Sequence, residues 1–165
     1  MKIDLKKYAP PGVDVEREKN LFLTGMSFSA IYSSFFFVSF WDEWEDLWYH
    51  GIREPGIQTR TLREGAVMEP FAELLDQHLV GYLILALCMF ALVAAHYAYY
   101  SQGSKSIYLM RRLPDRKYLR RTCWTLPMAG VVICILAALI SLLLFFGVYV
   151  GFTPKECLPW NYGGY

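Results

Sequence analysis

Three long apolar runs constrain this chain more than any other feature. They cover residues 21–41, 79–100 and 126–150, and none of them contains Asp, Glu, Lys or Arg. A helix needs about 20 apolar residues to cross the roughly 30 Å hydrocarbon core of a bilayer. A soluble protein of 165 residues rarely contains three uncharged runs of this size. We therefore predict an all-α, polytopic membrane protein with three transmembrane helices.

The remaining residues form the connections of a single membrane domain, residues 1–165. We expect a cytoplasmic N-terminal segment (1–20), an outer loop with interfacial helices (42–78), a basic cytoplasmic loop (101–125) and an outer tail (151–165). No small-residue cleavage site follows the first run, so we expect no removable signal peptide.

The distribution of charge predicts the orientation. Five Lys or Arg lie in the first 20 residues and seven lie between Gln102 and Arg121, whereas the tail carries one. Residues 42–78 carry three basic residues against nine acids. Because Lys and Arg accumulate on the cytoplasmic side, we expect the N-terminus inside and the C-terminus outside, in the cell membrane. With a net charge of +1, nothing indicates a nucleic-acid partner.

Local patterns predict how the helices begin and end. The stretch DVEREKN can start a helix that feeds the first span, and the spacing of Trp41, Trp44 and Trp48 extends that helix past the hydrocarbon. The apolar spacing of residues 71–82 predicts an amphipathic helix that leads straight into the second span. Pro127 is expected at the start of the third span, where a missing N–H costs little.

Small residues on the predicted spans indicate close helix packing. They recur at four-residue steps, which lets another helix approach. These residues are Gly25, Ser29 and Ser33 in the first span, and Ala91 and Ala95 in the second.

The sequence favours a protein that is not an enzyme and holds no cofactor or metal. It contains no GxxxxGK[ST], HExxH or GxSxG motif. His96 is ionisable and close to the end of the second run, which makes it a candidate proton-relay group. A relay needs a second titratable group, and none lies within the predicted spans, so we expect His96 to reach the interface instead. Cys157, predicted outside, is expected to carry a free thiol.

The basic segment QGSKSIYLMRRLPDRKYLRR, residues 102–121, combines charge with an apolar ridge. An orientation signal needs the charges but not the ridge, which would suit a groove on a cytoplasmic protein. Pro114 ends a helical turn, and Asp115 can cap a following helix.

This segment resembles the cytoplasmic loop of type-2 permeases of ATP-binding-cassette (ABC) transporters, which forms a coupling helix seated on the ATPase subunit. The matching residues are Gly103, Ser104, Ile107, Tyr108, Leu109, Leu113, Pro114, Arg116 and Leu119. The resemblance implies that the ridge contacts the ATPase and that Arg111 and Arg112 orient it. Such permeases usually have six spans, so a half-size relative would also need a further permease subunit or a homo-oligomer.

Two other hypotheses remain open. The chain can be a small scaffold or accessory protein whose basic loop binds anionic membrane lipid or a partner, with about 1 kcal/mol per basic residue available near the surface. An enzymatic site among the acids of the outer loop is compatible with the sequence but has no motif to support it.

Overall fold

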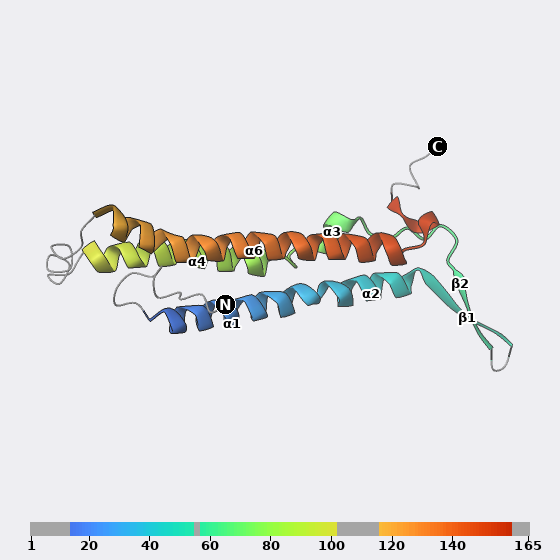
Figure 1. The fold of residues 1–165 in the computed structure, drawn as a ribbon. Helices are drawn as coiled ribbons and strands as arrows, with labels where there is room; N and C mark the ends of the chain where they lie inside the picture. The colour runs from blue at the N-terminus through green and yellow to red at the C-terminus, as the bar shows by residue number, and fades with distance from the viewer. Residues whose placement is uncertain (1–13, 55–56, 102–115, 160–165) are drawn as a thin grey trace, which may run out of the picture. The chain divides into compact units, whose positions relative to one another are not determined.

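The computed structural model describes residues 14–54, 57–101 and 116–159 (Figure 1). Its elements follow in the order α1 (Val15–Ser34), α2 (Phe36–Asp46), β1 (Trp48–Glu54), β2 (Ile57–Leu62), α3 (Phe71–Leu75), α4 (Val80–Ser101), α6 (Arg116–Phe152) and a 3-10 turn, η2 (Lys155–Cys157). Contacts group into two compact units. The first unit comprises Met1–Ala30 and Val80–Ala138, and the second comprises Ile31–Leu79 and Leu139–Tyr165.

The prediction of three helices long and apolar enough to cross a membrane is confirmed. They lie within Val15–Asp46, Val80–Ala98 and Cys123–Phe152. Large apolar side chains point away from the protein along them, including Ile140 at 64% and Leu143 at 67% exposure. Lipid is the solvent that such surfaces match, because apolar patches of this extent are rare on soluble monomers.

The first helix begins before its apolar run, as the stretch DVEREKN indicated. The Asp14 carboxylate accepts a hydrogen bond from the backbone N–H of Arg17 at 3.3 Å, which satisfies one of the free donors of the first turn. At its other end, α1 is followed after Phe35 by α2, which continues past the predicted span to Asp46. The predicted helical extension therefore holds for Trp41 and Trp44, whereas Trp48 begins strand β1.

Small residues bring the helices of the first unit together. A methyl group added at Gly81 of α4 would lie 3.1 Å from the Cα of Ser29 on α1. One added at Gly130 of α6 would lie 3.2 Å from the sulfur of Met89 on α4. The backbones of α1 and α4 therefore approach too closely at Gly81 for a larger residue to fit without displacement.

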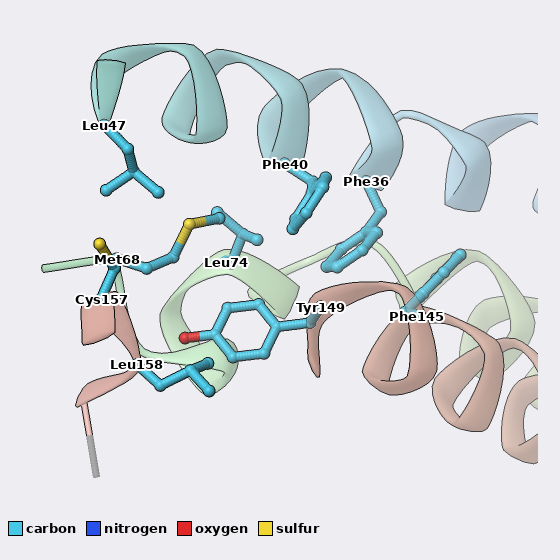
Figure 2. Packing of buried hydrophobic residues seen from close by; sticks show 9 residues of the cluster. All are labelled: Phe36, Phe40, Leu47, Met68, Leu74, Phe145, Tyr149, Cys157 and Leu158. Atoms are coloured by element: carbon cyan, nitrogen blue, oxygen red, sulfur yellow. The ribbon is translucent and has the colours of Figure 1, made fainter. Parts of the chain in front are cut away.

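The second unit has an aromatic core (Figure 2). Phe36 of α2 stacks on Phe145 of α6 with ring centroids 4.4 Å apart, and Phe36 and Tyr149 are fully buried. The Tyr149 hydroxyl donates a hydrogen bond to the carbonyl of Glu69 at 2.8 Å. The cluster consists of Phe36, Phe40, Leu47, Met68, Leu74, Phe145, Tyr149, Cys157 and Leu158. Residues between α2 and α4 are thus packed onto the ends of two helices.

The all-α expectation holds for most of the described chain but not for residues 48–62. Strands β1 and β2 pair antiparallel from Trp48↔Leu62 to Glu54↔Ile57, with an irregularity between Ile52 and Glu54. The sequence around this pairing is rich in β-branched and aromatic residues, which favour a pleated surface. In the described part of residues 42–78, α-helix is accordingly confined to the end of α2 and the short α3.

Two local predictions are wrong. The expected continuous helix over residues 71–82 is interrupted after Leu75, where Asp76 has a φ of 24°, and α4 starts only at Val80. Pro127 lies inside α6, eleven residues after its start at Arg116, rather than at a helix start. A proline there cannot donate to the carbonyl of Cys123, so the ladder of α6 lacks one hydrogen bond at this level.

Candidate functional site

A buried pair of ionisable side chains lies in the first unit. Nε2 of His96, on α4, is 2.7 Å from Oε1 of Glu18, on α1. The side chains are only 9% and 17% exposed, respectively. Within the described residues, neither Nδ1 of His96 nor Oε2 of Glu18 has a hydrogen-bond partner, and both atoms are buried. The pair is therefore shielded from solvent and joins two helices that are far apart in the sequence.

Local helix geometry places both groups on facing surfaces. On α1, Glu18 follows the buried Val15 by three residues, which puts both on one side of the helix. On α4, His96 follows the buried Val93 by the same step. Glu18 is close to the start of α1 and His96 is close to the end of α4, so the pair lies near one end of both helices.

This pairing overturns the reason for expecting His96 at the interface. The second titratable group that a proton site requires is present, because α1 begins six residues before the predicted span and carries Glu18 into contact. His96 is also buried, at 7% exposure, rather than open to the interface. Sequence reasoning missed the contact because a single Glu in a polar, charged stretch carries no signal of which helix it will face.

An apolar cavity adjoins Glu18. Its volume is about 170 Å³, and α1, α4 and α6 all contribute to its lining. Phe22, Met89 and Pro127 are among the apolar residues, while Glu18 and Lys19 supply the charged groups. The pocket is open on one side and its lining is largely apolar, so it supplies few polar groups to Glu18.

The predicted helix-packing residues occupy different environments. Gly25 and Ser29 face α4, with Gly25 against Leu85 and Ser29 against Gly81. The Ser29 hydroxyl donates back to the Gly25 carbonyl at 2.9 Å, so its polar group is satisfied within α1. Ser33 is buried in the second unit. Ala91 and Ala95 are exposed on α4 and face away from the described part of the chain.

Most residues of the predicted coupling segment lie outside the described residues. These are Gly103, Ser104, Ile107, Tyr108, Leu109, Arg111, Arg112, Leu113 and Pro114. Arg116 and Leu119 belong to the first turns of α6. The helix predicted to follow Asp115 therefore starts as expected.

The second unit offers no comparable constellation of charged groups in its described part. All four cysteines of the chain are free thiols, Cys157 among them. Burial, and secondly the neighbouring Glu156 carboxylate, raises the pKa of the Cys157 thiol, so it stays protonated near neutral pH. The described residues contain no group of three or more His, Cys, Asp or Glu placed to hold a metal ion.

The chain was compared with protein families, curated proteins and solved structures. No protein family matches it, and no curated protein or solved structure is similar to it. Inferences about its function therefore rest on its own residues and geometry.

Proposed function

We propose that the chain is the transmembrane subunit of an ABC-type transport system in the cell membrane, driven by a separate cytoplasmic ATPase. The proposed contact is the basic segment 102–121. The N-terminus lies in the cytoplasm and the C-terminus outside in this proposal. A second membrane subunit or a second copy of the chain would complete the translocation path, since three helices offer little room for a private aqueous path.

The observation that carries the proposal is the continuity of α6. This helix begins at Arg116, within the basic segment, and runs to Phe152, whereas its apolar part begins only at Cys123. Its 37 residues correspond to about 55 Å at 1.5 Å per residue, well beyond the roughly 30 Å of hydrocarbon. The seven residues before Cys123 add about 10 Å of helix at the basic end.

Such an extension suits mechanical coupling. A partner that changes shape on binding ATP moves the spans only if it contacts the two states of the membrane subunit differently. A helix that runs without interruption from the end of the basic segment into the bilayer passes a displacement at Arg116 directly to the span. Pro127 weakens α6 just inside its apolar part, which is where a bend costs least.

The sidedness in the proposal follows from charge. The N-terminal 20 residues and segment 102–121 hold twelve of the sixteen Lys and Arg between them, and the positive-inside rule assigns both to the cytoplasm.

The first experiment is purification of the tagged chain from its native host in a mild detergent, followed by identification of bound proteins by mass spectrometry. Stoichiometric recovery of an ABC ATPase supports the proposal. Recovery of the chain alone or with lipid overturns it and favours the scaffold that binds anionic lipid.

A single substitution tests the contact itself. Leu109→Asp places a charge on the apolar ridge and keeps every basic residue, so we expect the ATPase to be lost while insertion and topology stay unchanged. Leu109→Ile is the matched control and should retain the ATPase. Wild-type recovery of the ATPase with Leu109→Asp would show that the ridge is not the contact. Binding to anionic vesicles that fades with salt, yet survives replacement of Ile107, Tyr108 and Leu109 by Ser, would identify lipid as the partner.

A further inference from the structure

We infer that Glu18 and His96 together form a proton-binding site that controls how firmly α1 is held to α4. The inference does not depend on an ATPase partner or on the direction of transport. It stands on a short contact between buried His96 and partly buried Glu18, which lie on different helices beside a largely apolar pocket.

Charge balance sets how many protons the pair holds. With one dissociable proton, located on Oε1 of Glu18 or on Nε2 of His96, the pair is neutral overall and the contact at 2.7 Å is a strong hydrogen bond. Adding a proton gives a carboxylic acid and an imidazolium, with net charge +1. Removing the proton gives a carboxylate and a neutral imidazole, with net charge −1. Either net charge is costly in a buried, weakly polar environment, so the state with one proton is the one that suits the packed helices.

Burial makes this site different from an ion pair on a surface. An exposed pair exchanges protons with little effect on stability, because water screens both charges. Here both unpartnered atoms, Nδ1 of His96 and Oε2 of Glu18, are buried, and no described residue forms a hydrogen bond to either of them. The apolar wall of the cavity beside Glu18 adds to the penalty. Gain or loss of a proton must therefore be met by moving the side chains apart or by admitting water.

Other titratable groups surround the pair. On the described side chains of α1, α4 and α6 at this level they are Glu16, Arg17, Lys19, Tyr97 and Cys123. Lys19 lines the cavity together with Glu18, and Cys123 is buried. Glu16, Arg17 and Tyr97 are exposed, so their charges are screened. Of these groups, Lys19 shares the pocket with Glu18, so its charge could also change the titration of the pair. A Lys19 variant is therefore included as a control.

The proton site is tested by ¹⁵N-histidine NMR of the full chain in lipid nanodiscs across a pH series. The chain has three histidines. Their NMR signals are assigned by the signal that disappears in each of the variants His96→Gln and His78→Gln. We expect the titration midpoint of His96 to shift in Glu18→Gln, and to keep its wild-type value in Glu16→Gln and in Lys19→Gln. An unchanged His96 titration in Glu18→Gln would overturn the inference.

Control of packing is tested separately, by the melting temperature of the same samples against pH. We expect the wild-type melting temperature to fall on both the acid and the alkaline side of a maximum, and the profile of the double variant Glu18→Gln, His96→Gln to be flat. The exchanged variant Glu18→His, His96→Glu keeps one proton between the same positions, so the maximum should return. Superimposable profiles of the wild type and the double variant would show that protonation does not control packing. If the double variant does not fold, the wild-type profile and the exchanged variant still decide the question.

Discussion

Replacement of Phe36 by Ala tests whether the aromatic core holds the second unit together. Phe36 is fully buried and stacks on Phe145, with ring planes 15° apart and centroids at 4.4 Å. It also meets the edges of Phe71 and His78 at 6.1 and 6.0 Å. Truncation removes all of these contacts at once and leaves a cavity that the neighbouring rings fill only in part.

The expected loss of stability comes from the cavity that the substitution leaves and not from transfer of the ring out of water. In lipid the unfolded reference state also surrounds the Phe36 ring with hydrocarbon, so the hydrophobic term largely cancels. A residual cavity of about 100 Å³ at about 24 cal/mol per Å³ costs about 2.4 kcal/mol. Loss of the stack on Phe145 adds about 0.5–1.5 kcal/mol. We therefore expect Phe36→Ala to lower the free energy of unfolding by about 3 kcal/mol, within the range seen for buried aromatic residues.

The measurement is reversible unfolding in mixed micelles titrated with a denaturing detergent, followed by tryptophan fluorescence. Phe35→Ala is the matched control, because this neighbour is 55% exposed, and it should change stability by less than about 0.5 kcal/mol. Phe36→Leu keeps most of the volume and should recover more than half of the loss. Equal effects of Phe35→Ala and Phe36→Ala would refute the packing argument, since exposed and buried rings would then count alike.

Two further substitutions probe other contacts by the same assay. Gly81→Val should lower the free energy of unfolding by about 1–3 kcal/mol, because the added side chain meets the backbone of Ser29. Gly147→Val is the control and should have little effect, because Gly147 has open space around it. A similar loss at both positions would argue against a tight contact between α1 and α4. Tyr149→Phe removes the hydrogen bond to the carbonyl of Glu69 and should cost about 1 kcal/mol, whereas full retention of stability would mean that this carbonyl is satisfied in another way.

Local sequence patterns were sufficient for the spans. Whether a run such as 126–150 suits a bilayer depends on its own length and lack of charge, so no knowledge of its neighbours is needed. The start of α1 near Asp14 was also predictable, because capping is an interaction between residues a few positions apart. The start of α6 at Arg116 likewise agrees with the prediction. The coupling segment remains a prediction from sequence, since most of its residues lie outside the described part of the chain.

Prediction failed where a sequence pattern is compatible with more than one local structure. Residues 71–82 have helical apolar spacing, yet the chain breaks at Asp76, and His78 then packs against Phe36. Residues 48–62 contain strand-forming residues and turn signals, but these were not recognised as a hairpin. At residues 71–82 contacts with other segments outweigh a local helical preference, whereas the hairpin of residues 48–62 follows its own strand preference.

By itself, the sequence determined that three helices suit a bilayer, and it placed the basic segment between the second and third. The tertiary structure decided which polar groups meet inside. Glu18 and His96 are 78 positions apart, and each is unremarkable in its own stretch of sequence. Only the packing of α1 on α4 brings them to 2.7 Å, because small residues such as Gly81 let the two helices approach. Helix formation depends on neighbouring residues, whereas a buried ion pair depends on which surfaces of two distant helices are brought together.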